Sequence, residues 1–252
     1  MTVVDRQTTD GITTVTLDRP DALNSFNNTV FDELCDTFLA AATDEQCKVL
    51  VLTGAGRAFS AGADLKAKGN DITPRHGLAG LLESIIDFPK PFIVAANGLG
   101  VGIGCTILGL ADVAFAAESA RFRCPFSSLG ITAEASSTYT FPRLLGHQRA
   151  SWILLSAEWV SSADAKDAGL VNEVFPDEGF LEAAIDKARV LAALPKDSLI
   201  QTKDLIVGPQ REAMKAAVRS ENAALDRLSG GPANQEAIAA FKEKRTADFS
   251  SL

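Results

Sequence analysis

The chain has 252 residues, enough to bury a substantial core without disulfides or bound metal ions. Hydrophobic residues make up 46% and charged residues 22%, which is ordinary for a globular protein. The formal net charge of -8 argues against nucleic acid or an anionic membrane surface as a partner, and every apolar run is too short to span a bilayer.

The cysteines and the two chain ends bear on the compartment. The four cysteines show no CxxC pairing, so we expect free thiols in a reducing compartment. Residues 1–10 are polar and lead directly into a strand pattern, so no signal peptide is expected. The final Ser250-Ser251-Leu252 lacks the basic middle residue of a peroxisomal address. These features favour a cytoplasmic location.

The first half of the chain alternates strand and helix patterns. The β-branched alternation and the continuous apolar runs predict strands at residues 12–17, 49–52, 92–96 and 113–116. Apolar spacing predicts helices at residues 30–42, 75–88 and 103–110, and residues 66–74 form a polar loop. Strands, glycine-rich turns and helices in succession indicate an α/β core with parallel strands.

After about residue 140 the strand patterns fade and helical spacing takes over. Helices are predicted at residues 143–160, 163–168, 179–194, 198–228 and 234–244. Gly230-Gly231-Pro232 separates the last two, as the end of one helix and the start of the next require. We predict an α/β core of residues 1–195 followed by a helical C-terminal portion, residues 196–252.

Three segments carry a more specific pattern. They are Asp18-Arg19-Pro20-Asp21-Ala22-Leu23-Asn24, Arg57-Ala58-Phe59-Ser60-Ala61-Gly62-Ala63-Asp64-Leu65 and Ala96-Asn97-Gly98-Leu99-Gly100-Val101-Gly102-Ile103-Gly104. In this order and spacing they resemble the enoyl-CoA hydratase/isomerase family, the crotonases, over nearly the whole chain. The resemblance implies a spiral core of repeated strand-strand-helix units, an acyl-coenzyme A thioester substrate, and a homotrimer or dimer of trimers. It implies no cofactor beyond the coenzyme A of the substrate.

The two glycine-rich turns suit the chemistry of a thioester. Its carbonyl oxygen takes up negative charge when the α-proton leaves, and losing one N–H donor aimed at that oxygen typically costs about 3 kcal/mol. By resemblance, Ala63 and Ile103 occupy the two donor positions. The second position would lie at a helix N-terminus, which favours an anion. On spacing alone, the glycines fit ordinary tight turns as well.

Carboxylates decide which reaction such a scaffold performs. Hydratases of the family carry one glutamate after the second glycine-rich turn and another after a proline behind the third strand. The matching positions here hold Thr106 and Phe126, and neither side chain transfers protons at neutral pH. Residues 125–142 instead resemble the peroxisomal-type 3,2-enoyl-CoA isomerases, whose catalytic glutamate matches Glu134.

A single base is sufficient for isomerisation. Glu134 would take a proton from C2 of a 3-enoyl-CoA, the dienolate would rest between the two N–H donors, and the acid would return the proton to C4. Apolar neighbours such as Ile131 would make the carboxylate more basic. Ala133 and Ala135 depart from the proline and glycine usual in that subgroup. Without the resemblance, a solvated glutamate at a helix start is the favoured interpretation of Glu134.

By resemblance, further residues contact coenzyme A. They are Ala22, Leu23, Ala61, Asp64 and Leu65 in the first two segments, and Phe241 and Lys244 near the C-terminus, which often reach a neighbouring subunit. Asp64 also suits a role in shaping its loop, and Lys244 suits a solvated helix end. Asp112 lies in an apolar run, where a paired structural carboxylate is expected.

Other functional classes fit the sequence less well. His76 and His147 have no partners at metal-ligand spacing, no serine lies in a GxSxG context, and the glycine turn at residues 98–102 does not match GxGxxG. We therefore expect no metal site and no nicotinamide cofactor. Three functions stay open: a 3,2-enoyl-CoA isomerase, another crotonase activity such as hydration, and a non-catalytic acyl-CoA-binding protein.

Overall fold

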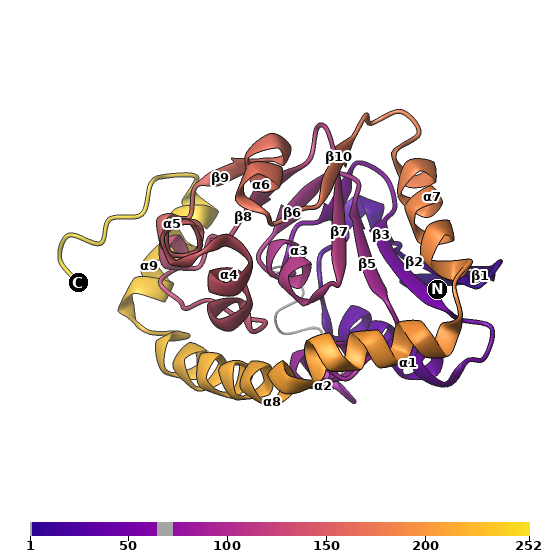
Figure 1. Ribbon diagram of the computed structural model, residues 1–252. Helices are drawn as coiled ribbons and strands as arrows, with labels where there is room; N and C mark the ends of the chain where they lie inside the picture. Colours follow the sequence, from indigo (N-terminus) through magenta and orange to yellow (C-terminus); the bar gives the residue numbers. More distant parts are fainter. Residues whose placement is uncertain (1, 65–72) are drawn as a thin grey trace.

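Two β-sheets form the centre of the computed structural model, which describes residues 2–64 and 73–252 (Figure 1). Within these residues the larger sheet has the strand order β1-β2-β3-β5-β7-β10 and the smaller has the order β4-β6-β8-β9. The larger sheet consists of β1 (Val4–Thr9), β2 (Ile12–Leu17), β3 (Val49–Gly54), β5 (Phe92–Ala96), β7 (Val113–Ala117) and β10 (Glu173–Phe175). The smaller consists of β4 (Ala58–Ser60), β6 (Leu99–Val101), β8 (Arg121–Arg123) and β9 (Trp159–Ser161).

A unit of two strands and a helix repeats along the chain. β3 enters the larger sheet, β4 enters the smaller one, and α2 (Gly77–Ile86) follows. The pattern recurs with β5, β6 and α3 (Ile103–Thr106), and again with β7, β8 and α4 (Ser137–Leu145). Because each unit adds one strand to both sheets, the chain winds as a spiral, and the predicted core of strand-strand-helix units is confirmed.

Burial of the central strands follows from their composition. Every residue of β3 and of β5 is buried, as the continuous apolar runs predict. The helix α1 (Asn28–Thr43) packs against β1 and β2, and α7 (Phe180–Ala192) packs against β2, β3, β5 and β7. Asn27 begins α1 by accepting the Val30 N–H at 3.0 Å, which satisfies one of the free donors of the first turn.

The expectations after residue 140 need correction in two places. The helix expected at residues 143–160 is divided into α4 and α5 (His147–Ser156) at Gly146, whose φ of +77° cannot continue a helix. β9 and β10 also lie in this half, where no strand was expected. A strand of three residues is too short to show a period, and it forms because a neighbouring strand supplies its hydrogen bonds. β9 pairs with β8, and β10 pairs with β7.

The remaining C-terminal elements are helical, as predicted. They are α6 (Ser162–Ala168), α8 (Lys196–Leu228) and α9 (Pro232–Glu243). α8 passes along α2 and reaches α4, so it spans the width of the molecule (Figure 1). The division into two domains at residue 195 stays a prediction. Among the described residues, no helix combines the length and the apolarity that a membrane span requires.

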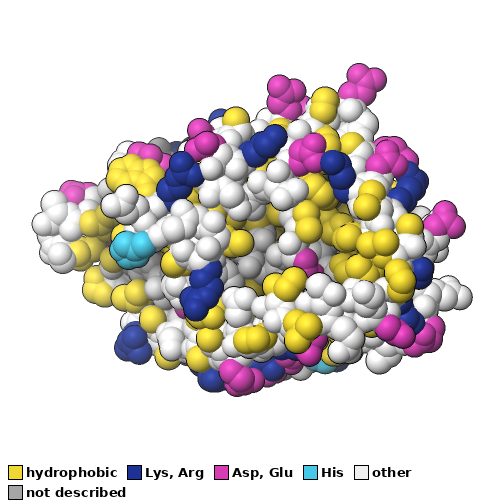
Figure 2. All heavy atoms as spheres, in the orientation of Figure 1, with side chains coloured by type: hydrophobic (Ala, Val, Ile, Leu, Met, Phe, Trp, Pro, Cys, Tyr) yellow, Lys and Arg dark blue, Asp and Glu magenta, His cyan; other side chains and the backbone are white. Residues whose placement is uncertain are grey.

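Cysteine usage agrees with the expectation from composition. Figure 2 shows acidic and basic side chains interspersed on one face of the molecule, with hydrophobic side chains between them. All four cysteines are buried free thiols. The prediction of buried free thiols is confirmed.

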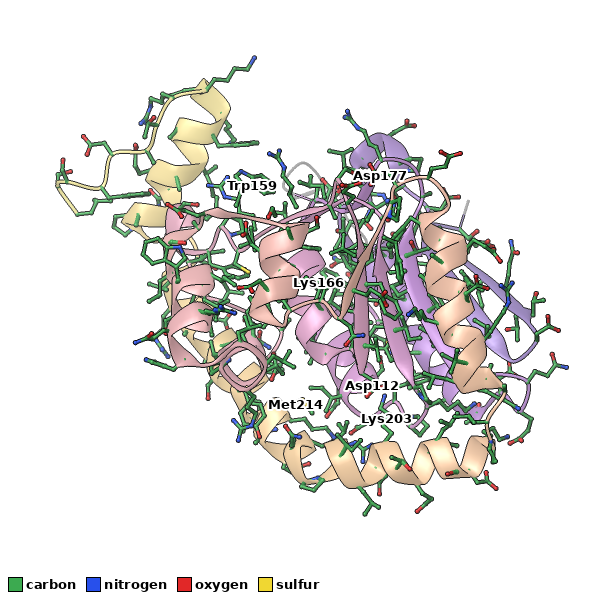
Figure 3. All side chains as sticks on the ribbon, turned by 45° about the horizontal axis from the view of Figure 1, so that its top comes forward. Asp112, Trp159, Lys166, Asp177, Lys203 and Met214 are labelled. Atoms are coloured by element: carbon green, nitrogen blue, oxygen red, sulfur yellow. The ribbon has the colours of Figure 1, made fainter. Side chains whose placement is uncertain are left out.

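An ion pair between the buried Lys203 and the more exposed Asp112 ties α8 to the larger sheet. The Lys203 ammonium lies 2.8 Å from the Asp112 carboxylate and donates to the Lys90 carbonyl at 2.8 Å. Asp112 in turn accepts the N–H of Phe92, at the start of β5, at 2.7 Å. Both side chains are labelled in Figure 3, where α8 passes the end of the strands. Burial lowers the pKa of Lys203, and the charge of Asp112 opposes this shift. Asp112 is thus the paired structural carboxylate that its sequence context predicts.

Replacing the buried Lys203 with methionine is expected to lower the free energy of unfolding by about 1–3 kcal/mol at neutral pH, because the buried Lys90 carbonyl and the Asp112 carboxylate both lose their charged donor. Lys215→Met is the matched control on the same helix. Lys215 pairs with the half-exposed Asp87 at 2.8 Å, and an exposed pair contributes less than about 1 kcal/mol. Urea denaturation of both variants measures the difference. Equal losses in the two variants would contradict the structural role of Lys203.

Candidate active site

The first glycine-rich turn directs the Ala63 N–H away from its neighbouring segment. Phe26 donates its N–H to Gly62 O at 2.8 Å and accepts the N–H of Asp64 at 2.9 Å, so Phe26 and Ala63 form a parallel bridge. In such a bridge the residue between the two bonded ones turns its own N–H and C=O to the opposite side. The Ala63 N–H therefore points away from Phe26.

Hydrogen bonds to the segment of residues 18–24 hold this turn in place. The Asn24 amide donates to the carbonyls of Ala55 and Ala58 at 2.9 and 2.8 Å, and its oxygen accepts the Arg19 N–H at 2.9 Å. The Ser60 hydroxyl donates to Asn24 O at 2.8 Å. These bonds explain why Asn24 is nearly fully buried with a φ of +55°. Asparagine tolerates that conformation better than most residues.

The second glycine-rich turn leaves the first N–H of α3 without a partner inside the helix. Gly102 has a φ of +54° and donates its N–H to Arg123 O at 3.0 Å. Its carbonyl accepts the N–H groups of Cys105 and Thr106 at 2.8 and 2.9 Å, which closes the first turn of the helix. Ile103 is the first helical residue, so its N–H has no partner within the helix. The predicted position at a helix N-terminus is confirmed.

The two turns meet, and Glu134 lies against them. A Cβ atom at Gly62 would lie 2.7 Å from Val101 O, which shows how closely the turns approach. A Cβ atom at Gly102 would lie 3.8 Å from the Gly62 Cα and 3.8 Å from the Glu134 Oε1. Glu134, Gly62 and Gly102 come from three separate segments of the sequence. The structure therefore brings the predicted base to the two predicted donor turns.

Surroundings make the Glu134 carboxyl more basic than usual. Burial, and then the negative charge of Glu221, raise the pKa of Glu134 to about 7, while a hydrogen bond from the Ile103 N–H opposes the rise. The side chain stays partly accessible to solvent. A carboxyl with a pKa near neutrality can accept and return a proton under physiological conditions. This partial burial argues against the alternative of a solvated glutamate at a helix start.

The positions that match the hydratase glutamates are structural. Thr106 is fully buried, and its hydroxyl donates to Gly102 O at 3.3 Å. Phe126 is 4% exposed and belongs to the main hydrophobic core. A threonine hydroxyl bonded to the backbone and a core phenylalanine cannot hold and activate a water molecule by proton transfer. Among the described residues, the carboxyl beside the two turns is that of Glu134.

The residues expected to contact coenzyme A fall into two groups. Ala22, Leu23 and Ala61 lie on the edge of the first turn, where the Ala61 N–H donates to Leu23 O at 2.9 Å. Asp64 forms an ion pair with Arg19 at 2.9 Å. This ion pair supports the role of Asp64 in shaping the loop. Leu65 and most of the predicted polar loop lie outside the described residues.

The second group lies on the C-terminal helix. Phe241 is 68% exposed on α9, and Lys244 ends that helix with a φ of +55°. α9 packs against the 3-10 helix Ser127–Leu129, where the Asn234 amide donates to Leu129 O at 2.8 Å. The roles of both residues toward coenzyme A stay predictions. Among residues 2–64 and 73–252, no cluster of side chains has the composition of a metal site.

One residue of the site was missed in the sequence. Glu221 is 4% exposed on α8, and its charge acts on Glu134. Its position in the sequence could have identified it. At the helical period it continues the buried row of Met214 and Val218. A glutamate on the apolar stripe of a helix is unusual enough to mark a buried carboxylate.

Comparison with known proteins gives matches over nearly the whole chain. The model of the enoyl-CoA hydratase/isomerase family matches residues 7–251. The 2,3-dehydroadipyl-CoA hydratase of Escherichia coli (strain K12) is 37% identical over 93% of this chain and 93% of its own. The enoyl-CoA delta isomerase 2 of Homo sapiens is 35% identical over 84% of this chain, and the match spans 56% of that longer protein.

The fold of the chain also matches solved structures over nearly its whole length. A crystal structure of an enoyl-CoA hydratase/isomerase from Pseudoalteromonas atlantica T6c has 30% identity and a TM-score of 0.93, covering 98% of this chain and 100% of that one. The spiral core and the two converging glycine-rich turns are thus accompanied by a full-length family match. The chain belongs to the enoyl-CoA hydratase/isomerase family, the crotonases, whose members act on acyl-CoA thioesters.

Proposed function

We propose that this crotonase is a 3,2-enoyl-CoA isomerase, which converts a 3-enoyl-CoA into the 2-trans-enoyl-CoA. The observation that carries the proposal is one basic carboxyl, Glu134, placed against the Ile103 N–H donor. Double-bond migration moves one proton from C2 to C4 and needs no water, so one acid/base group is sufficient. The buried Thr106 and Phe126 disfavour hydration.

In this mechanism the Glu134 carboxylate takes the C2 proton, and the electron pair moves into the thioester carbonyl. The N–H groups of Ala63 and Ile103 hold the resulting negative oxygen of the dienolate. The protonated Glu134 then gives its proton to C4, and the double bond re-forms between C2 and C3. The carboxyl returns to its starting state, so all atoms and charges balance.

Substrate binding is expected to increase the basicity of Glu134. In the free protein the Ile103 N–H donates to Glu134, and this bond lowers the pKa of the carboxyl. A thioester oxygen that takes over the Ile103 N–H removes the bond, so the remaining influences, burial and the charge of Glu221, raise the pKa further. One donor thereby serves the base before binding and the dienolate afterwards.

The proposed function also implies contacts to the coenzyme A moiety of the substrate. The backbone of Ala22, Leu23 and Ala61 would contact its adenine and pantetheine portions, with Asp64 and Leu65 beside them. Phe241 and Lys244 would reach coenzyme A from the C-terminal helix of the same or a neighbouring subunit in a homotrimer or dimer of trimers. Analytical ultracentrifugation would measure the oligomeric state.

A decisive assay incubates the purified protein with a 3-enoyl-CoA and follows the absorbance of the conjugated 2-enoyl product. We expect turnover in the range common for enzymes, about 1–1,000 per second. Hydration is the second candidate, because the relative from Escherichia coli is named a hydratase. Accumulation of a 3-hydroxyacyl-CoA from a 2-enoyl-CoA, with no double-bond migration, would favour it and refute the isomerase.

Exchange of the α-proton with solvent distinguishes the two enzymatic functions, isomerase and hydratase, from a non-catalytic binding protein. An isomerase in deuterated water is expected to incorporate deuterium at the α-carbon of a thioester substrate, because enolate formation is reversible. A protein that binds the thioester tightly without any exchange would be a non-catalytic acyl-CoA-binding protein, and the proposed function would then be wrong.

A further inference from the structure

Glu221 is a carboxylate buried inside the protein. It lies on α8 between the first turn of α4 and the apolar cluster that contains Met214 and Val218, and it is 4% exposed. Figure 3 labels Met214 on the same stretch of α8. A buried carboxylate is costly unless hydrogen bonds replace its water. Its partners therefore indicate why it is there.

Among the described residues, the hydrogen bonds to the Glu221 side chain come from the segment that follows Glu134. The Ser136 N–H donates to its Oε2 at 2.7 Å. The Thr138 N–H and hydroxyl donate to its Oε1 at 2.9 and 2.6 Å. These donors lie at the start of α4, where N–H groups have no partner in the helix. Glu221 thus caps α4 from a different helix, 85 positions away from Ser136.

The capped turn has an unfavourable backbone. Ala135 and Ser136 both have a φ of +59°, a left-handed conformation that non-glycine residues adopt at a cost. Ala135 is packed in the cluster with Leu82, Ile86 and Met214. Two successive left-handed residues reverse the chain directly after Glu134. The turn therefore fixes the position of the Glu134 backbone, from which its side chain extends. The bonds to Glu221 hold this turn closed.

Charge adds a second effect. Glu221 is the charged group whose repulsion raises the pKa of Glu134 after burial. The hydrogen bond between the Cys124 and Cys105 thiols, then burial, and then the charges of Cys105 and Glu134 raise the pKa of Cys124. Other charged groups on the elements packed around the turn are exposed or already paired: Glu83 on α2, Arg143 stacked on Tyr139 of α4, and Lys215 paired with Asp87 from α8.

We propose that Glu221 is a positioning residue of the active site, which holds the strained turn that presents Glu134 and keeps that carboxyl ready to accept a proton. The inference rests on the proposed function for its catalytic meaning. Glu221 makes no contact with the reacting atoms in this assignment and acts through Glu134. A glutamate whose only task is to cap α4 would leave the titration of Glu134 unchanged when it is replaced.

Titration of Glu134 tests the inference directly. The protein is labelled with ¹³C at the glutamate carboxyl carbons, and the Glu134 signal is assigned by its loss in Glu134→Gln. The unaltered protein is expected to show a midpoint at a pH of about 7. In Glu221→Gln the repulsion is gone, so the midpoint is expected to move to lower pH. Glu212→Gln, an exposed change on the same helix, is the control and is expected to leave the midpoint in place.

Kinetics supply the second readout. Isomerisation by Glu221→Gln is expected to show a kcat reduced about ten- to a hundredfold with little change in KM, because the base is weaker and less well held. The rising limb of its kcat/KM profile, which reports the ionisation of the base in the free enzyme, is expected to move to lower pH with the midpoint. A midpoint equal to that of the unaltered protein, or an unchanged kcat, would overturn the inference.

A second variant covers the case in which Glu221→Gln does not fold. Glu221→Asp keeps the charge but withdraws it by one methylene, so the midpoint is expected to fall partway and kcat to decrease. A midpoint and a kcat that both equal the parent values would overturn the role of Glu221. If the unaltered protein does not isomerise at all, the proposed function fails, and the comparison of midpoints still decides whether Glu221 sets the state of Glu134.

Discussion

Glu134→Gln is expected to slow isomerisation about a thousandfold, with KM changed little. The amide has nearly the same shape as the carboxyl, and its carbonyl oxygen can still accept the Ile103 N–H, but it cannot take a proton from C2. The rate of 2-enoyl-CoA formation and the rate of α-proton exchange should fall together, because both depend on the same step. Glu83→Gln, an exposed change on α2, is the matched control and should retain full activity. Undiminished turnover in Glu134→Gln would remove Glu134 from the mechanism.

The pH dependence of the free energy of unfolding is an independent test of the raised pKa of Glu134. The fold raises the pKa of Glu134 from 4.5 to about 7, so the folded state keeps a proton that the unfolded state has already released. The stability associated with this group is full below pH 4.5 and is lost as the pH rises through about 7. Glu134→Gln has no such loss. Its free energy of unfolding relative to the unaltered protein should therefore increase across that window in urea denaturation, which also verifies that the variant is folded.

The second large effect is expected from Gly62→Ala. At this position the φ is +83°, and the new Cβ would lie 2.7 Å from Val101 O. The two turns must then separate, which moves the Ala63 N–H away from the thioester oxygen. Losing one such donor costs about a hundred- to a thousandfold in kcat. Steady-state kinetics with a 3-enoyl-CoA would measure the loss.

Gly179→Ala separates the geometric effect from backbone strain. Gly179 precedes α7 and has a φ of +73°, but a Cβ atom there would meet nothing within 4 Å. Both variants place alanine in a left-handed conformation, so both are expected to lose about 1 kcal/mol or more of stability. Activity should fall in Gly62→Ala alone. Similar kcat values for the two variants would contradict the convergence of the turns as the source of the catalytic geometry.

Local patterns in the sequence determined the parts of the fold that depend on near neighbours. The continuous apolar runs identified β3 and β5 as buried strands, because a strand covered on both faces has no polar side. The glycine-rich turns and the start of α3 were also predictable, since left-handed residues and free helix N–H groups have local signatures. Glu134 was identified by resemblance, and its catalytic role stays a prediction.

Tertiary structure alone decided which of these segments meet. β4, β6 and β8 have three residues each, too few to show a period, and they exist because the spiral sets them side by side. The pKa of Glu134 depends on Glu221, which lies 87 positions further along the chain on another helix. Burial and electrostatic repulsion act through space rather than along the chain. The carboxyl that the sequence supplied therefore became a base of near-neutral pKa only when folding enclosed it beside a second carboxylate.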